Sequence, residues 1–369
     1  MITPDIAVVG GGLFGRCLAW RASREGARIV LLDSGGSGGE HSAAWVAAGM
    51  ISPTTEAIEA DPQVTSMGDR SLELWPQWLA ELPIAVFYRN AGTVLVWHRE
   101  HAQEAARAQK IISLRVARSR LEYLESSQLV EIEPELGTRF SQALYVRGEA
   151  WIDNRGLLKA VGLALDEEGV ECHWETPIEN GVFPAAGIVV DCRGMGAKDD
   201  LRELRGVRGE IVRLHAPEIE LNHMLRLLHP RYPVYIAPRP EGRLVVGATS
   251  IESEDRTPAS VRGVLELLMS AYSVIPTMAE ARILEFNTQV RPALPDNLPA
   301  LRFDRERKIL HINGFYRHGF LLTPTVVEEA LNLLFGRTSG RWPCLDVNCS
   351  ADIPGFSNHS REVQMCHSS

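Results

Sequence analysis

Three glycines near the start of the chain, Gly10, Gly12 and Gly15, have the spacing of a turn that binds phosphate groups. They follow an apolar, β-branched run at residues 6–9 and precede a segment with apolar residues at helical spacing. Such a turn directs free backbone amides of a helix N-terminus at negative charge, and lets a pyrophosphate approach the backbone. Asp33 comes 21 residues after Gly12, where an acid can accept hydrogen bonds from a ribose. The pattern predicts a dinucleotide site, and an ordinary glycine-rich turn is the alternative.

A second chemical pattern is the density of small residues that follows. Residues 42–53 read SAAWVAAGMISP, and four glycines lie just before them within 35–39. Small side chains allow a flat molecule to approach the backbone closely. The stretch therefore predicts contact with a flat ring, and a tightly packed core helix is the alternative.

The composition narrows the class of protein. The 369 residues include 38 Lys and Arg against 47 Asp and Glu, a net charge of −9, which disfavours nucleic acid and anionic membranes as partners. With 45% hydrophobic and 23% charged residues, we expect a folded globular chain. No apolar run reaches the roughly 18 to 20 residues of a membrane span. The six cysteines form no CxxC pair and the start does not resemble a signal peptide, so we expect a cytoplasmic location with reduced thiols.

The elements that must position these residues alternate in type along the chain. Strands are predicted at residues 6–9, 29–32, 92–97, 188–192, 234–237, 244–248, 283–290 and 309–312. Helices are predicted at residues 13–25, 154–168, 259–273 and 320–335. Strand, glycine turn and helix follow one another at both ends of the chain, so one cofactor touched by both ends is the simplest explanation.

The fold class predicted from this order is α/β with an α+β insert. A Rossmann-like cofactor domain is expected from residues 1–84, 143–214 and 291–345. The β-rich inserts at 85–142 and 215–290 are expected to form a second domain with an antiparallel sheet. Residues 346–369 are interpreted as a polar C-terminal tail.

Together the motifs resemble those of the D-amino acid oxidase-like flavoproteins, and within them the glycine oxidases of thiamine biosynthesis. The resemblance covers the chain to about residue 340. It rests on Gly10-x-Gly12-x-x-Gly15, residues 47–50, Gly209-Glu210, residues 234–239 and 242–249, Arg291-Pro292 with Asp296 and Pro299, and residues 314–319. It implies a two-domain fold that binds FAD without a covalent link, and in which the inserts at 85–142 and 215–290 form the substrate-binding domain.

The resemblance also implies which residues contact FAD. They are Gly10, Gly12, Leu13, Phe14, Gly15, Asp33, Ser34, Ser42, Ala43, Ala44, Ala48, Gly49, Met50, Ile178, Gly194, Gly314, Phe315, Tyr316, Arg317, His318, Gly319, Phe320 and Leu321. In this set, Asp33 and Ser34 are expected at the adenosine ribose and the backbone of Ile178 at the adenine. Residues 315–321 are expected along the pyrimidine edge of the isoalloxazine.

Three residues are implied at the substrate. Arg291 matches the arginine that binds the substrate carboxylate, Tyr235 its hydroxyl partner, and Arg317 a second cation. A planar guanidinium suits the task, because two parallel hydrogen bonds fix the carboxylate and aim the α-hydrogen at flavin N5. The alternatives are a surface turn residue for Arg291 and plain sheet packing for Tyr235, and His318 is interpreted as structural. The sequence shows no metal-ligand spacing, and no metal is expected.

The implied activity is the oxidation of glycine or a similarly small amino acid by molecular oxygen. It gives the imine, then glyoxylate, ammonia and hydrogen peroxide, for the thiazole moiety of thiamine. Other readings stay open: a dehydrogenase that reduces a carrier, an enzyme for a secondary amine such as sarcosine, a flavoprotein that modifies a protein side chain, and a non-catalytic FAD-binding protein. A homo-oligomer is compatible with the sequence.

Overall fold

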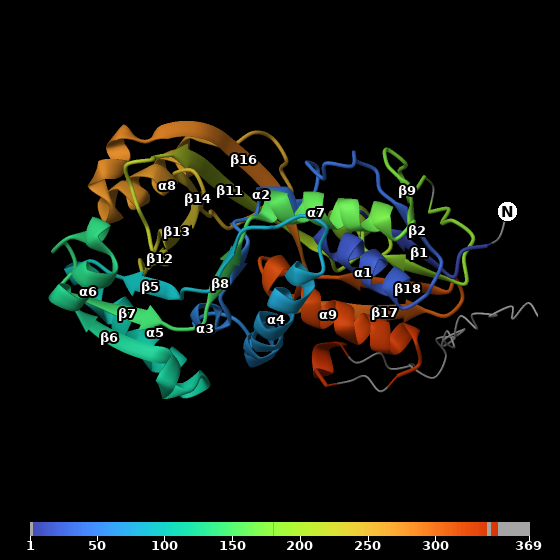
Figure 1. Ribbon diagram of the computed structural model, residues 1–369, viewed down its shortest axis with the longest axis horizontal. Coiled ribbons are helices and arrows are strands. Elements are labelled where there is room, and N and C mark those ends of the chain that lie inside the picture. The colour runs from blue at the N-terminus through green and yellow to red at the C-terminus, as the bar shows by residue number, and fades with distance from the viewer. Residues whose placement is uncertain (1–2, 180, 338–340, 346–369) are drawn as a thin grey trace, which may run out of the picture.

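The computed structural model describes residues 3–179, 181–337 and 341–345, and the expected tail at 346–369 lies outside them. The molecule is elongated, with one large sheet towards each end and a small sheet between them (Figure 1). The predicted α/β class with a second, antiparallel-sheet part is confirmed. No helix in the described part of the chain has the length and apolar character needed to cross a membrane.

The first large sheet contains the predicted nucleotide turn. It has six strands in the order β17-β18-β10-β1-β2-β9, all parallel to their neighbours except β17. The strands are β1 (Ile6–Val9), β2 (Ile29–Leu32), β9 (Glu171–His173), β10 (Ile188–Asp191), β17 (Ala300–Asp304) and β18 (Ile309–Asn313). Every residue of β1, β2 and β10 is buried, as expected for parallel strands covered on both faces.

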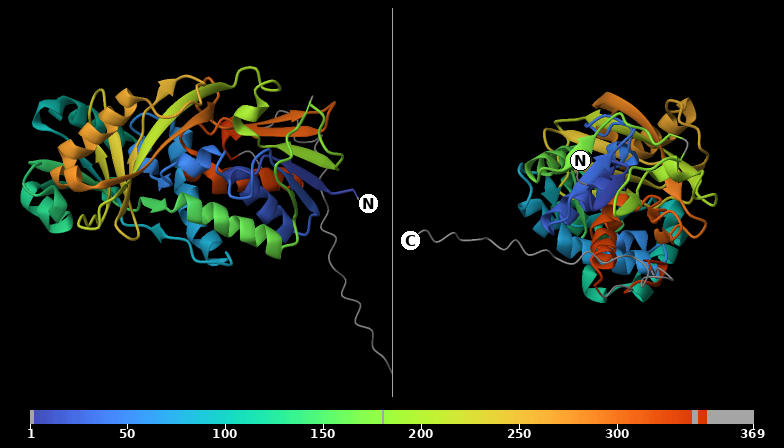
Figure 2. Two further views of the ribbon diagram at one scale, coloured as in Figure 1. Left: turned by 90° about the horizontal axis from the view of Figure 1, so that it is seen from above. Right: turned by 90° about the vertical axis from the view of Figure 1, so that its right-hand side faces the viewer.

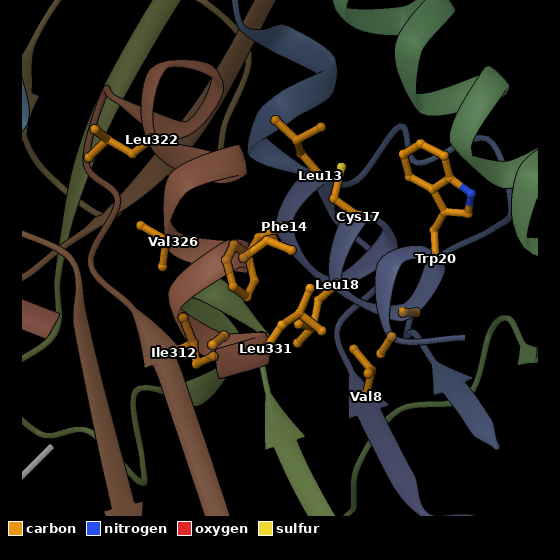
Figure 3. Packing of buried hydrophobic residues seen from close by; sticks show 14 of the residues in the cluster. Val8, Leu13, Phe14, Cys17, Leu18, Trp20, Ile312, Leu322, Val326 and Leu331 are labelled. Carbon is orange, nitrogen blue, oxygen red and sulfur yellow. The ribbon is translucent and has the colours of Figure 1, made fainter. Parts of the chain in front are cut away.

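A layer of four helices packs together beside this sheet (Figure 2). The helices are α1 (Leu13–Arg24), α4 (Pro62–Ala80), α7 (Asn154–Glu167) and α9 (Gly319–Leu334). Helix α1 ends because Gly26 adopts a left-handed conformation, with φ +91°. Phe14 and Leu18 of α1 lie between β1 and α9, where Leu331 closes the core (Figure 3). The two ends of the chain therefore share one hydrophobic core.

The second large sheet has nine strands in the order β15-β11-β14-β13-β12-β5-β7-β6, with β16 on the free edge of β11. Adjacent strands in this sheet run antiparallel, except that β5 and β12 pair parallel to each other. The strands are β5 (Thr93–Val96), β6 (Leu121–Glu125), β7 (Gln142–Val146), β11 (Arg205–His215), β12 (Met224–Leu227), β13 (Val234–Arg239), β14 (Arg243–Gly247), β15 (Ile251–Glu252) and β16 (Arg282–Ala293). Three helices accompany this sheet: α5 (Ala102–Arg115), α6 (Ser126–Ile132) and α8 (Val261–Val274).

Short elements connect the two large sheets. They are the small sheet of β3 (Met50–Ile51), β8 (Ala150–Ile152) and β4 (Tyr88–Arg89), with helices α2 (Ala43–Val46) and α3 (Pro53–Glu56). The domain limits expected from the sequence stay a prediction. Strands β7 and β11, which fall almost entirely within the 143–214 segment expected in the cofactor domain, both belong to the nine-stranded sheet. Strand β11 pairs along its whole length with β16, more than sixty residues later, so local patterns could not reveal its place in this sheet.

Candidate active site

A cavity of about 870 Å³ lies where the two large sheets meet. Its wall contains Arg291, Tyr235 and Arg317, the three residues expected at the substrate. It also contains every residue expected to bind the cofactor except Gly15, Ile178 and Gly314. The structure thus brings together residues from both ends of the chain and from the nine-stranded sheet.

The three glycines of the turn are needed for different reasons. A Cβ atom at Gly15 would lie 1.8 Å from the carbonyl oxygen of Gly10, so glycine lets α1 pack against β1. Gly10 has φ +112°, and a Cβ there would lie 2.5 Å from the carbonyl oxygen of Cys192. At Gly12, by contrast, a Cβ would meet nothing closer than the Cβ of Ser42 at 3.8 Å. The fold itself therefore has room for a side chain at Gly12. Glycine at this position leaves the cavity wall free for the phosphate groups of a ligand.

Asp33 lies at the end of β2, on the cavity wall. Its carboxylate accepts hydrogen bonds from the amides of Gly11 at 2.5 Å and Gly35 at 2.7 Å. Arg16 is buried, and no sequence motif indicated its role: its Nε donates to the carbonyl oxygen of Gly11 and its Nη2 to that of Ser37, both at 2.7 Å. Arg16 therefore ties the glycine turn to the glycine-rich loop that follows Asp33.

Arg291 projects from β16 across the neighbouring strand. A Cβ on Gly209 of β11 would lie 2.1 Å from Nη2 of Arg291, so the guanidinium rests directly on a residue without a side chain. Its Nη1 donates to the carbonyl oxygen of Thr249 at 3.1 Å. Burial lowers the pKa of Arg291, and the positive charge of Arg317 lowers it further. A buried cation in this setting is stabilised by an anion bound in the cavity.

Tyr235 on β13 reaches over β14 in the same way. A Cβ on Gly247, its partner in the strand register, would lie 2.6 Å from the Tyr235 hydroxyl. Burial raises the pKa of this hydroxyl, so it stays protonated and can donate a hydrogen bond. Gly209 and Gly247 therefore act as a pair that makes room for the two groups expected at a carboxylate. Arg291 is a strand residue and not a surface turn residue, and Tyr235 lines the cavity wall while it also packs against the sheet. The roles of both side chains at a substrate carboxylate stay a prediction.

Arg317 is already balanced by two carboxylates. Its Nε donates to Glu56 and its Nη2 to Glu59, both at 2.8 Å. Nε2 of His318 lies 2.9 Å from the same Glu56 carboxylate, which agrees with a structural role for this histidine. The expected contact of Arg317 with a substrate carboxylate stays a prediction.

Three further charged residues line the cavity wall near Arg317, and no sequence pattern predicted them there: Glu56, Glu59 and Arg226. Arg226 is only 7% exposed, and its Nη1 lies 3.6 Å from Glu56. It is paired in register with Tyr235, so the two side chains share one face of the sheet. Burial alone would raise the pKa of Glu56, but Arg317, His318 and Arg226 together bring it well below its usual range. Glu56 is therefore ionised and a poor proton acceptor.

Two of the residues outside the cavity wall have clear positions. Ile178 packs on the other face of the six-stranded sheet with Val9 and Val30, and its backbone contact with adenine stays a prediction. Gly314 has φ +87° and permits the turn between β18 and α9, where a Cβ would meet Leu294 at 2.7 Å.

Sequence comparison assigns the chain to a known protein family. A model of the FAD dependent oxidoreductase family matches residues 5–330, and the chain belongs to that family. A Rhizobium etli protein, provisionally named thiamine biosynthesis oxidoreductase ThiO, is 38% identical over 329 residues, which are 89% of this chain and 96% of that protein. The glycine oxidase of Geobacillus kaustophilus is 26% identical over 346 residues, which are 87% of this chain and 90% of that protein.

The solved structures agree on the fold. The crystal structure of glycine oxidase from Geobacillus kaustophilus has a TM-score of 0.81 at 24% identity, covering 91% of this chain and 96% of that chain. The crystal structure of iminodiacetate oxidase from Chelativorans has a TM-score of 0.79 at 20% identity, and the match covers 93% of this chain and 99% of that chain. The resemblance to glycine oxidase-like flavoproteins and the expectation of FAD are confirmed.

Proposed function

We propose that the protein oxidises glycine or a similarly small amino acid, with FAD as the hydride acceptor and molecular oxygen as the final electron acceptor. The amino acid loses two hydrogens to become the imine, and water converts the imine to glyoxylate and ammonia. Oxygen takes up the two electrons and two protons as hydrogen peroxide. A role in supplying the thiazole moiety of thiamine is supported by the name of the Rhizobium etli relative.

One observation carries the proposal: Arg291 and Tyr235 reach into the cavity over Gly209 and Gly247. A guanidinium and a protonated hydroxyl side by side match the hydrogen-bonding needs of one carboxylate. A carboxylate fixed in this way leaves the α-carbon of a small amino acid directed towards the middle of the cavity. A cavity meant for a protein side chain would not need these groups.

Other residues of the cavity wall fit the cofactor. Gly12 leaves space for a pyrophosphate, Asp33 presents a carboxylate for a ribose, and the small residues 43, 44, 48 and 49 leave space for a flat ring. FAD supplies the group that accepts a hydride. The residues of the chain bind and orient the substrate beside it and exclude water.

The proton balance needs no strong base. The amine must be neutral when the hydride leaves, which the solvent can bring about, since an amine loses a proton readily once its carboxylate is neutralised by Arg291. Glu56, which lies on the same cavity wall, is held ionised by Arg317, His318 and Arg226 and has little tendency to accept that proton.

The test is an anaerobic titration of the FAD-loaded protein with glycine, sarcosine, D-alanine and a carboxylate-free amine. Glycine should bleach the flavin absorbance, and air should restore it with the formation of hydrogen peroxide. Preference for sarcosine would favour the secondary-amine alternative, and bleaching that air does not reverse would favour a carrier-linked dehydrogenase. An unbleached flavin with every amine would contradict the proposal and favour a protein-modifying or non-catalytic role.

A further inference from the structure

Two buried arginines of the nine-stranded sheet, Arg213 of β11 and Arg239 of β13, hold the small-residue segment from outside the cavity. Each is 9% exposed, and neither belongs to the cavity wall. Nη2 of Arg239 donates to the carbonyl oxygen of Ala48, and Nη2 of Arg213 donates to that of Trp45 at 3.3 Å. Residues 43–50, which we call the strap, are therefore bound by two guanidinium groups on one side.

The other side of the strap faces the cavity. The carbonyl and N–H groups of a trans peptide point in opposite directions. Because the carbonyl of Ala48 is directed at Arg239, the N–H of Gly49 points away from Arg239. Gly49 is buried and lines the cavity, and its N–H has no hydrogen-bond partner among the described residues. A buried N–H without a partner is rare in proteins, so this one indicates an acceptor on a bound ligand.

A surplus of positive charge lies behind the strap. Arg155 of α7 forms an ion pair with Glu285 at 2.7 Å. Asp153 is the other carboxylate whose charge acts on both Arg213 and Arg239, yet it forms an ion pair with neither in the described part of the chain. Three guanidinium groups therefore share two carboxylates. Burial lowers the pKa of Arg213 and of Arg239 to about 10, so both stay charged at neutral pH.

Neither of the two arginines is fully satisfied by the protein. The Nε atoms of Arg213 and Arg239 are buried and have no hydrogen-bond partner among the described residues. A buried charge is costly unless an opposite charge approaches it. In the proposed reaction, the flavin ring is the group that gains negative charge next to the strap. A neutral ring that accepts a hydride takes up two electrons and one proton, and so becomes an anion.

We propose that Arg239, together with Arg213, stabilises the reduced flavin through the strap and thereby raises its reduction potential. This inference rests on the FAD site of the proposed function. Arg239 acts through the peptide between Ala48 and Gly49, because a cation at the carbonyl polarises the peptide and strengthens its N–H as a donor. Arg213 adds its charge. Both are positioning residues, since neither lines the cavity.

The strap is held firmly enough for this role. The amide of Ile152 donates to the carbonyl oxygen of Gly49 at 2.9 Å. Gly49 has φ +63°, and a Cβ there would collide with the carbonyl oxygen of Ile152, so only glycine fits. The peptide that carries the free N–H is therefore bound on one side by Arg239 and on the other by β8.

The reduction potential of the FAD-loaded full chain tests the proposal. It is measured with a chemical reductant and a reference dye, so the result does not depend on any amino acid substrate. Arg239→Met should lower the potential by about 30 mV or more, which is a tenfold change in the equilibrium of a two-electron reduction. Arg239→Lys keeps the charge and should recover most of this. Arg107→Met, on an exposed position of α5, is the control and should have the wild-type potential.

Arg213→Met separates charge from hydrogen bonding, because it leaves the bond between Arg239 and Ala48 in place. This variant should also have a lower potential than the wild type. Sulfite, which adds to the flavin as an anion, should bind about tenfold more weakly to both methionine variants. Methionine variants with the wild-type potential, or a lysine variant as low as Arg239→Met, would overturn the proposal.

The wild type gives a further measurement that needs no variant to fold. Its potential should change by about 30 mV per pH unit from pH 9 down to pH 6, because an anionic reduced ring takes up one proton with two electrons. A slope of about 59 mV per unit would mean a neutral reduced ring and would contradict the proposal. Glycine that fails to bleach a flavin with the expected potentials would instead contradict the proposed substrate, and would support the arginine roles.

Discussion

At the scale of single residues, several glycines decide what the cavity can hold. Gly10 and Gly15 are required by the protein itself, because a Cβ there would meet backbone atoms at 2.5 and 1.8 Å. Gly12 and Gly209 serve the site instead: one borders open cavity, and the other lies beneath the guanidinium of Arg291. Substitutions at these two kinds of position should therefore fail in different ways.

The first prediction concerns Gly12 and Gly15. Gly12→Val should leave the protein folded but unable to retain FAD, because the added side chain enters space needed by the pyrophosphate. Gly15→Ala should lower the free energy of unfolding by about 2 kcal/mol or more, because α1 must move away from β1. Bound FAD is measured by absorbance, and folding of the apoprotein by circular dichroism. Normal FAD content in Gly12→Val would contradict the assigned role.

Arg291 should dominate substrate binding. If two charge-assisted hydrogen bonds of about 1.5 to 3 kcal/mol each hold the carboxylate, Arg291→Ala should lower kcat/KM for glycine at least about a hundredfold. Arg291→Lys should recover only part of this, since an ammonium cannot form the planar pair of bonds. The exposed Arg107 on α5 offers a control, and Arg107→Ala should not change the kinetics. Near wild-type turnover by Arg291→Ala would remove the basis of the proposed function.

Gly209→Ala tests the same guanidinium without altering its charge. The methyl group would displace Arg291, whose flexible side chain can move, so the fold and FAD content should be kept. A displacement of about 1 Å can lower the rate on the order of a hundredfold, and kcat/KM should fall accordingly. Gly36→Ala is the matched control, because a Cβ at Gly36 meets nothing within 4 Å. Equal kinetics in the two variants would show that Gly209 has no positioning role.

At the scale of elements, local patterns were sufficient for some parts of the fold and insufficient for others. The unit from β1 to β2 was predictable because its strands, glycine turn and helix follow one another within about thirty residues. The parallel pairing of β5 with β12 and the position of β16 beside β11 depend on partners more than sixty residues away. Helix α3 has only four residues, and its last residue, Glu56, lines the cavity. Nothing in the sequence of this helix predicts that position.

A buried carboxyl group links two of these elements. Glu149 accepts hydrogen bonds from the amide of Thr55 in α3 at 2.6 Å, from the Thr55 hydroxyl at 2.7 Å and from Thr93 of β5 at 2.5 Å. Burial raises the pKa of Glu149 to about 7, more than these hydrogen bonds lower it. The folded protein therefore binds a proton more tightly than the unfolded chain does.

Stability should fall as the pH rises from about 4.5 to about 7, because the unfolded state releases this proton first. The loss is about 3 kcal/mol for a shift of this size. Glu149→Gln removes the titrating group, keeps one oxygen to accept from the Thr55 amide and presents an NH2 group that donates to the threonine hydroxyls, so it should abolish this part of the pH dependence. Urea unfolding at pH 5 and pH 8 measures it. A variant with the same pH dependence as the wild type would show that Glu149 is not the group responsible.

At the scale of the whole molecule, the cofactor site depends on both ends of the chain. The cavity wall combines residues 10–14 with residues 315–321, and α1 packs on α9. The sequence predicted that these two segments lie together at one cofactor site, because both carry a strand, a glycine turn and a helix. It did not predict Arg226 or Glu59, whose positions follow from the assembly of the second sheet and of the segment after α3.

FAD should therefore stabilise the whole molecule against heat. At a concentration of about one hundred times its Kd, a ligand that binds only the folded state adds about 2.7 kcal/mol. Calorimetry should show a higher Tm with FAD than without it.

Asp33→Ala should need more FAD for the same rise in Tm. The KM of the FAD-loaded variant for glycine should stay nearly unchanged, since Asp33 belongs to the part of the wall expected at the ribose. A selective loss of substrate binding in that variant would contradict its role.

The shared core of α1 and α9 also has a consequence for synthesis on the ribosome. The glycine turn at residues 10–15 leaves the exit tunnel long before its partner helix α9, which ends at Leu334. A nascent chain that stops before β18 has neither the strand that pairs with β10 nor the residues at 315–321. The cavity wall is therefore complete only after α9 has been made, and a chain released before that point lacks this part of the expected FAD site.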